Sequence, residues 1–201
     1  IRTPMNAIMG MGRELGRTDL DTIQQRYVAA INTASDNLLV IINDILDSSK
    51  IEAGRLELDK VGFKPSMILQ HVERVLGHRA SEKGIHLITE LDQRVRPVLM
   101  GDPHRLDQIL FNIAGNALKF TDDGSVRLRF QCDGRVGDTQ HIVLTVADTG
   151  TGMSKAFVEK IFEPYSQEHR RSGGTGLGMT ISKRLVELMN GTIHIEDRKS
   201  V

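Results

Sequence analysis

Three clusters of glycine and polar residues in the second half of the sequence have the residue types that can bind a nucleotide. The last of them, 173–179, reads Gly-Gly-Thr-Gly-Leu-Gly-Met and precedes an apolar segment at 181–189. Glycines let the backbone approach a ligand, and a helix that follows them offers free N–H groups and its positive dipole end to phosphate. The run has no Lys-Ser/Thr pair as in a Walker A loop, and no strand precedes it as in a Rossmann fingerprint. Taken alone, it is equally compatible with a flexible turn.

The middle cluster, 148–153, reads Asp-Thr-Gly-Thr-Gly-Met and directly follows an alternating segment at 142–147 that predicts a strand. A carboxylate at the end of a strand, here Asp148, can accept a hydrogen bond from an exocyclic amine such as that of adenine. An Asp-initiated turn is the alternative interpretation of the same residues.

The first cluster lies on a predicted helix, 103–120. Asn112 and Asn116 are four residues apart and therefore share a helix face, and Lys119 lies three residues past Asn116. An amide oxygen can complete an octahedral Mg²⁺ shell whose other ligands are phosphate oxygens and water. A solvated helix face is the alternative for each of these residues taken singly.

Residues 1–54 predict a helical hairpin that leads up to these clusters. Apolar residues recur every three or four positions over 23–51 and again over 5–15, and the break at 16–21 includes Thr18, Asp19 and Asp21 as capping candidates. Two helices alone bury little apolar surface, so we expect the hairpin to dimerise into a four-helix bundle. The stripe on the longer helix comprises Ile23, Tyr27, Ile31, Ala34, Leu38, Ile41, Ile45 and Ser48.

Residues 55–201 contain both segments with the three-to-four-residue periodicity of helices and segments with the two-residue alternation of strands. This mixture predicts a two-layer α/β sandwich with helices on one side of a sheet. The predicted helices are 67–75, 103–120, 157–161 and 177–189, and the predicted strands are 85–91, 97–100, 126–130, 142–147 and 192–196.

The composition narrows the functional classes. The 201 residues carry 26 basic and 26 acidic side chains, so the formal net charge is zero. The protein therefore has no overall electrostatic attraction to nucleic acid or to an anionic membrane. The single cysteine, Cys132, excludes an internal disulfide and a cysteine-clustered zinc site. No apolar run approaches the ~20 residues that span a bilayer. Because the sequence begins at Ile1 without an initiator Met, we expect a fragment of a longer protein.

The order of the motifs resembles that of sensor histidine kinases, in particular the kinase core of hybrid sensor kinases. Four stretches are similar to the N, G1, F and G2 boxes of that family, and the leading Ile-Arg-Thr-Pro-Met-Asn of 1–6 looks like the end of its H box. Residues 44–54 also look like the end of the second dimerisation helix. The four boxes are Asn112-x-x-x-Asn116-Ala117-x-Lys119-Phe120-Thr121, Asp148-x-Gly150-x-Gly152, Ile161-Phe162-Glu163-Pro164-Tyr165 and Gly174-Thr175-Gly176-Leu177-Gly178.

The resemblance implies a Bergerat-type ATP-binding fold after a dimerisation and phosphotransfer hairpin, with ATP and Mg²⁺ as cofactors. Asn116 would ligate Mg²⁺ with Asn112 close by, Lys119 would contact phosphate, and Asp148 would bind the adenine amine. Thr3 is similar to the residue that assists dephosphorylation of a response regulator in that family, whereas the sequence alone is equally compatible with Thr3 as an N-cap followed by Pro4 at the first helical position. The remaining residues implied at the nucleotide are Gly150 and Gly152 around the base, Phe162, Gln167, Arg170 and Arg171 at a lid, and Gly174, Thr175, Gly176, Leu177 and Gly178 along the triphosphate.

The implied function is transfer of the γ-phosphoryl of ATP to a histidine on the hairpin and then to an aspartate of a response regulator. The accepting histidine would lie two residues before Ile1, and the family has at least one more strand after Val201, so we expect the catalytic domain, 55–201, to be truncated. A non-catalytic scaffold that dimerises and binds nucleotide is the alternative. A gyrase-like or Hsp90-like ATPase is disfavoured, because those enzymes carry a glutamate where Asn112 stands. We expect a cytoplasmic homodimer that contacts a response regulator, binds no nucleic acid and meets a membrane only through segments outside 1–201.

Overall fold

The computed structural model describes residues 2–168 and 175–197. The chain forms two compact units, Ile1–Leu56 and Glu57–Val201. Within the described residues, no helix combines the length and the apolar character that a membrane crossing needs.

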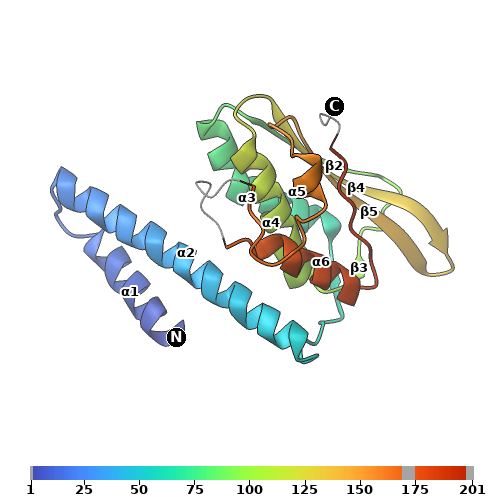
Figure 1. Cartoon of the computed structure of the whole chain (residues 1–201), viewed down its shortest axis with the longest axis horizontal. Coiled ribbons are helices and arrows are strands. Elements are labelled where there is room, and N and C mark those ends of the chain that lie inside the picture. The colour runs from blue at the N-terminus through green and yellow to red at the C-terminus, as the bar shows by residue number, and fades with distance from the viewer. Residues whose placement is uncertain (1, 169–174, 198–201) are drawn as a thin grey trace. The chain divides into compact units, whose positions relative to one another are not determined.

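The first unit is a helical hairpin of α1 (Arg2–Leu15) and α2 (Thr22–Glu52) (Figure 1). Asp21 caps α2, because its side chain accepts hydrogen bonds from the N–H groups of Ile23 and Gln24, both at 2.8 Å. The Gln24 side chain accepts in return from the Asp21 N–H at 3.0 Å, which completes a capping box. Of the three capping candidates in the predicted break, Asp21 is therefore the one that is confirmed.

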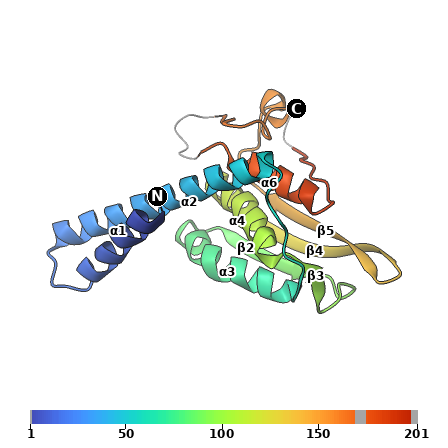
Figure 2. The ribbon, with the colours of Figure 1, turned by 90° about the horizontal axis from the view of Figure 1, so that it is seen from below.

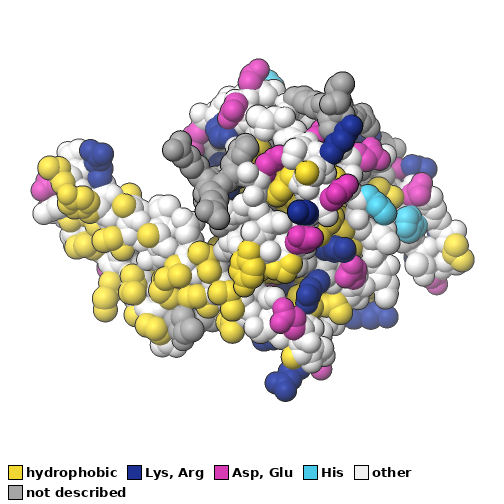
Figure 3. Space-filling view, viewed as in Figure 1, with side chains coloured by type: hydrophobic (Ala, Val, Ile, Leu, Met, Phe, Trp, Pro, Cys, Tyr) yellow, Lys and Arg dark blue, Asp and Glu magenta, His cyan; other side chains and the backbone are white. Residues whose placement is uncertain are grey.

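The two helices of the hairpin meet on a face of α2 that the apolar stripe does not include. Val28 and Ser35 are buried, and the Asn32 side chain lies so close to Gly12 of α1 that a Cβ at Gly12 would collide with it. The predicted stripe stays exposed except at Ser48, which is half-buried: the exposed fraction is 65% for Tyr27. Figure 3 shows hydrophobic side chains along this hairpin. Further exposed apolar residues of the unit are Ile8, Met11, Leu15, Ile23, Ile31, Leu38, Val40, Ile41, Ile45 and Leu46.

The second unit packs helices on one face of a sheet (Figures 1 and 2). Its predicted two-layer α/β architecture is confirmed. The helices are α3 (Pro65–Glu82), α4 (Pro103–Phe120), α5 (Lys155–Val158) and α6 (Gly178–Leu188), and the strands are β1 (Val61–Phe63), β2 (His86–Leu91), β3 (Leu99–Gly101), β4 (Ser125–Val136) and β5 (Thr139–Asp148).

The strands form a three-stranded sheet in the order β2-β4-β5 and a separate antiparallel pair of β1 with β3. β2 runs parallel to β4, and β5 runs antiparallel to it. Val126 near the start of β4 pairs with Asp148 at the end of β5. Since α4 leads directly into β4, this register brings the end of α4 and the end of β5 to the same place.

The core lies between the sheet and the helices α3 and α4. Alternate residues of β4 face it, so that Leu128 and Phe130 are almost fully buried. The opposite face of β4 is polar: Arg127 and Arg129 contact Glu90 of β2 at 3.0 and 2.6 Å. The hydrogen bond from Arg129 lowers the pKa of Glu90 below its ordinary value. One face of the sheet is thus polar, and the other is covered by α3 and α4.

Two predicted strands differ in the structure. Residues 192–196 do not form a strand within the described part of the chain. Alternation alone does not make a strand, which needs a partner with matching hydrogen bonds. The strand predicted at 97–100 is found at Leu99–Gly101 instead, since Pro97 has no N–H to donate to a ladder.

Candidate functional site

The helix α4 carries the first cluster, and its start is fixed by its own sequence. Asp102 caps it by accepting a hydrogen bond from the Arg105 N–H at 3.0 Å, and Pro103 occupies the first helical position. Apolar residues on one side of α4 enter the core. Asn112 and Asn116 are half-buried outside that apolar set, and Lys119 is exposed in the last turn.

The first amide of α4 holds the start of α6. The Nδ2 atom of Asn112 donates to the Ser182 Oγ at 2.8 Å. A Cβ at Gly178 would collide with the Oδ1 atom of Asn112, so any side chain there would displace the amide. Gly178 is the first residue of α6. The last glycine of the third cluster therefore lies against the first cluster.

The end of α4 contacts the turn that follows β5. The Phe120 carbonyl accepts a hydrogen bond from the Thr151 N–H at 3.2 Å. A Cβ at Gly150 would lie 2.5 Å from the same carbonyl oxygen, closer than any real contact. Asp148 shapes this turn, because its Oδ1 atom accepts from the Gly150 N–H at 2.9 Å. The second oxygen of this exposed carboxylate remains able to accept a hydrogen bond from a ligand amine.

The stretch 161–165 packs against α6 and the glycine turn before it. The Phe162 carbonyl accepts a hydrogen bond from the Thr180 hydroxyl at 2.9 Å, and the Lys183 ammonium lies 5.4 Å from the centre of the Phe162 ring. The Tyr165 N–H donates to the Gly176 carbonyl at 3.0 Å. Gly176 has φ +68°, and a Cβ there would lie 2.7 Å from Tyr165 backbone atoms. All four motifs are therefore joined by direct contacts, with α4 and α6 at the centre.

Lys119 is the cation that α4 brings to this region. Its ammonium lies 5.1 Å from the centre of the Phe120 ring. Desolvation lowers the pKa of Lys119 below its ordinary value. A lysine ammonium can pair with a phosphate oxygen as a point charge.

The other predicted site residues are distributed as follows. Gly152 has φ +75° and lies opposite the Asp197 carboxylate, Thr175 accepts a hydrogen bond from the N–H of the buried Leu177 at 3.1 Å, and Gln167 is exposed. Thr3 is exposed in the first turn of α1, in the other unit. Arg170, Arg171 and Gly174 lie outside the described residues.

Sequence reasoning missed three residues that hold this site together. Ser182 binds Asn112, and Asp197 accepts a hydrogen bond from the Met153 N–H at 2.8 Å. Lys83 donates to carbonyls at the end of α4. Ser182 could have been noticed as a polar residue one turn after Gly178 on an otherwise apolar helix face. The sequence offers no comparable signal for Lys83 or Asp197, because their partners lie 35 and 44 residues away.

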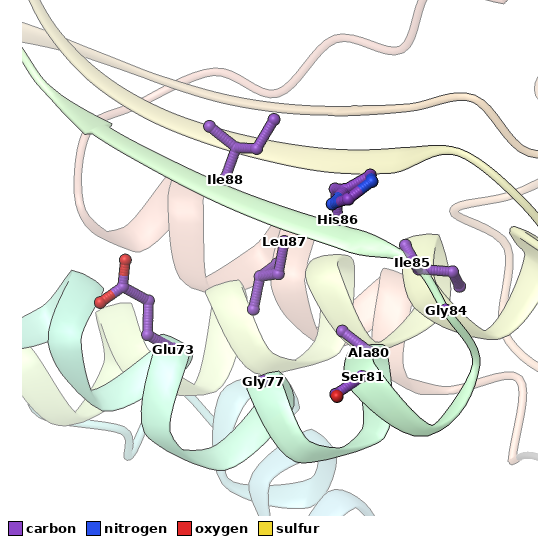
Figure 4. A pocket seen from close by; sticks show the side chains of 9 residues that line it. All are labelled: Glu73, Gly77, Ala80, Ser81, Gly84, Ile85, His86, Leu87 and Ile88. Carbon is purple, nitrogen blue, oxygen red and sulfur yellow. The ribbon is translucent and has the colours of Figure 1, made fainter.

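A separate hollow of about 520 Å³ lies between α3 and β2 (Figure 4). Its walls include Glu73, Gly77, Ala80 and Leu87, and it shares no residue with the four motifs. The Thr89 hydroxyl on β2 donates to the Glu73 carboxylate beside it. The chemistry that the motifs allow is therefore not located in this hollow.

Comparison with protein families gives two matches. Residues 101–201 match the model described as "Histidine kinase-, DNA gyrase B-, and HSP90-like ATPase", and residues 1–54 match "His Kinase A (phospho-acceptor) domain". The first match contains all four motifs.

Similar proteins and structures agree with these matches. The chain is 40% identical over 200 residues to "Sensor protein GacS" of Pseudomonas syringae pv. syringae, covering 98% of this chain and 22% of that protein. It is 36% identical over 197 residues to "Signal transduction histidine-protein kinase BarA" of Escherichia coli K12, covering 96% and 22%. The crystal structure of full-length ShkA in complex with AMPPNP has a TM-score of 0.75 and 35% identity, covering 94% of this chain and 39% of ShkA.

The chain spans about a fifth of the length of the GacS and BarA proteins. The family matches, the motif order and the contacts between the motifs point to one assignment. The chain belongs to the histidine kinase-, DNA gyrase B- and HSP90-like ATPases and, with its phospho-acceptor-type hairpin, forms a sensor histidine kinase core.

Proposed function

We propose that this chain binds Mg·ATP between α4, the turn at 148–153 and the start of α6, and that the protein to which it belongs transfers the γ-phosphoryl to a histidine on the hairpin and then to a response-regulator aspartate. One observation carries the proposal: α4 contacts both glycine turns, through Asn112 to Gly178 and through Phe120 to Gly150. The similar ShkA structure is a complex with AMPPNP, a triphosphate analogue of ATP.

The side chains have separate roles in this proposal. Asp148 accepts a hydrogen bond from the adenine amine, and Gly150 and Gly152 leave room for the base. Lys119 contacts phosphate, and the N–H groups at the start of α6 face the triphosphate. The other residues proposed at the nucleotide are Phe162, Gln167, Arg170, Arg171, Gly174, Thr175, Gly176 and Leu177. Phosphoryl transfer of this kind depends on positioning and charge neutralisation, which these groups would supply.

The amides of α4 suit a magnesium ion that arrives with the nucleotide. Asn116 and Asn112 offer neutral oxygen ligands, which Mg²⁺ accepts alongside phosphate oxygens and water. Among the described residues, no group of three or more His, Cys, Asp or Glu side chains could hold a metal by itself. In this proposal phosphate oxygens and water complete the shell of the ion, which when bound would neutralise phosphate charge.

Binding of Mg·ATP is the direct test of the proposal. Calorimetry on the 201-residue chain should show ATP binding that strengthens on addition of Mg²⁺. In the whole protein, γ-labelled ATP should then label a histidine, recognised by its acid lability, and the label should pass to a receiver-domain aspartate. Failure of the chain to bind ATP at all would overturn the proposal.

Asn116→Asp should weaken the Mg²⁺-dependent part of ATP affinity by about tenfold, because a carboxylate beside the triphosphate adds repulsion and changes the metal's ligand set. Calorimetric titrations of ATP with and without Mg²⁺ measure this difference. Asn37→Asp on the exposed surface of α2 makes the same chemical change elsewhere and should leave the Mg²⁺ dependence of ATP affinity unaltered. An unchanged Mg²⁺ dependence in Asn116→Asp would count against the ligand role.

We also propose that the exposed apolar stripe of α2 is the dimer interface of the hairpin. Ile31, about half exposed, should lie in the core of a four-helix bundle, so Ile31→Glu should shift the chain from dimer to monomer. Sedimentation velocity measures the change. Thr33→Glu adds the same charge at an exposed position outside both the stripe and the contact with α1, and should remain dimeric. Monomeric wild-type chain at micromolar concentration would contradict this interface.

The proposed partner of the hairpin is a response-regulator receiver domain. Thr3 in the first turn of α1 is the residue that we propose acts in dephosphorylation of the phosphorylated regulator. We further propose that the kinase core is cytoplasmic and binds no nucleic acid, consistent with its zero net charge.

A further inference from the structure

Lys83 contacts the C-terminal ends of two helices of the second unit, α3 and α4. Its backbone closes α3, since its N–H donates to the Arg79 and Ala80 carbonyls at 3.3 and 3.2 Å. Gly84 follows with φ +72°, and the Ile85 N–H donates a hydrogen bond back to the Ala80 carbonyl at 2.9 Å. This tight ending sets the direction in which the Lys83 side chain leaves α3.

The side chain of Lys83 caps the C-terminal end of α4. Its ammonium donates to three backbone carbonyls, those of Leu118 at 2.9 Å, Lys119 at 3.1 Å and Thr121 at 3.0 Å. A lysine ammonium has three N–H donors, so its donors match these three acceptors in number. A cation at this place is also favoured by the negative dipole ends of both α3 and α4.

The other carbonyls at the end of α4 have different partners. The Ala117 carbonyl accepts from the Thr121 hydroxyl at 2.8 Å. The Phe120 carbonyl accepts from the Thr151 N–H, and it is the oxygen that a Cβ at Gly150 would strike. Helix ends leave such carbonyls without helical partners. Here Lys83 donates hydrogen bonds to the carbonyls on either side of Phe120, whereas the Phe120 carbonyl accepts its hydrogen bond from the turn at 148–153.

We propose that Lys83 is a positioning residue of the nucleotide site. By holding the last turn of α4, it fixes the Phe120 carbonyl against Gly150 and Thr151, and with it the place of Lys119 relative to Asp148. Lys83 itself need not touch the nucleotide. The inference rests on the proposed binding of ATP between α4 and the glycine turns.

Positioning and stability are separable at this residue. The Lys83 side chain is 40% exposed, so water can reach the carbonyls if the ammonium is removed. Water satisfies carbonyl groups but does not fix the direction of a helix end. We therefore expect loss of Lys83 to affect nucleotide binding more than folding.

The experiment measures ATP affinity by calorimetry in Lys83→Met, Lys83→Arg and the wild-type chain, with Mg²⁺ present. Lys83→Met should bind ATP about tenfold more weakly, because a displaced end of α4 moves Lys119 and the turn at 148–153 out of position. Lys83→Arg should recover part of the loss, because the planar guanidinium keeps the charge but does not converge three donors on three carbonyls. In Lys83→Met, amide exchange measured by NMR should also speed up at Thr151.

Two controls separate positioning from general effects. Lys60→Met makes the same change at an exposed lysine and should bind ATP like wild type. Val72→Ala opens a cavity in the core at α3 and should lower the melting temperature. At a temperature where both proteins are folded, Val72→Ala should keep its ATP affinity while Lys83→Met does not.

The outcomes distinguish this inference from the proposed function. If the wild-type chain binds ATP and Lys83→Met binds it equally well, the inference is overturned and the proposed function stands. If the wild-type chain does not bind ATP, the proposed function fails and the inference fails with it. Should Lys83→Met fail to fold, Lys83→Arg decides: wild-type affinity and wild-type Thr151 exchange in that variant overturn the inference.

Discussion

Asp148→Asn is expected to weaken ATP binding about 100-fold, the upper range for one hydrogen bond to a charged group. The Oδ1 atom of Asp148 already accepts the Gly150 N–H at 2.9 Å. An asparagine would keep its oxygen on that N–H and present its NH₂ group to the adenine amine. Two donors would then face each other, whereas the carboxylate of the wild type offers an acceptor.

The same substitution should change base preference. Guanine carries a carbonyl oxygen where adenine carries its amine, so the new NH₂ group should tolerate GTP better than the carboxylate does. Titrations of ATP and GTP into both proteins measure the ratio of affinities. Asp59→Asn, at an exposed residue outside the motifs, should leave the ratio as in wild type. An equal preference for ATP over GTP in wild type and Asp148→Asn would remove the adenine role from Asp148.

Gly150→Ala is expected to abolish ATP binding at millimolar nucleotide and to destabilise the second unit. The added Cβ would lie 2.5 Å from the Phe120 carbonyl oxygen and 2.8 Å from the Asp148 Oδ1 atom. Gly150 is not among the glycines with positive φ, so the effect is steric rather than a backbone penalty. To relieve the clash, either the end of α4 or the turn must move, and overpacking of this kind costs about 1–3 kcal/mol.

Gly115→Ala is the matched control for this substitution. Gly115 lies inside α4, and a Cβ there meets nothing within 4 Å. Alanine in place of glycine in a helix interior should stabilise by about 1 kcal/mol, the opposite sign from Gly150→Ala. Thermal unfolding and ATP calorimetry on both variants provide the test. Wild-type ATP affinity in Gly150→Ala would show that the contact between Phe120 and Gly150 does not shape the site.

Much of the fold was predictable because it depends on short stretches of sequence. The helix 103–120 was predicted with the bounds that α4 has, and in the structure Asp102 caps its start with Pro103 at the first helical position. The Asp21 cap and the two-layer architecture follow from similarly local signals. The strand predicted at 192–196 is absent from the described structure, because a strand depends on a partner that periodicity does not identify.

The candidate site was predictable as a set of motifs but not as a set of contacts. The order of the four boxes in the sequence indicated candidate nucleotide-binding residues, and in the structure the described members of these boxes lie together around α4 and α6. Their spacing did not reveal that Asn112 contacts Gly178, or that the Phe120 carbonyl requires a glycine at 150. The stripe on α2 likewise indicated an apolar face, but the contact with α1 uses Val28 and Ser35 instead.

The sequence alone determined which residue types are present, where α4 and α2 begin, and in which order the polar and glycine motifs follow one another. The tertiary structure decided which carbonyl receives which donor: Lys83 reaches the end of α4 across 35 residues of sequence, and Thr151 reaches the Phe120 carbonyl. The physical reason is the range of the interactions. Caps and periodicity act between residues a few positions apart, whereas contacts between distant segments exist only once the sheet register and helix packing bring those segments together.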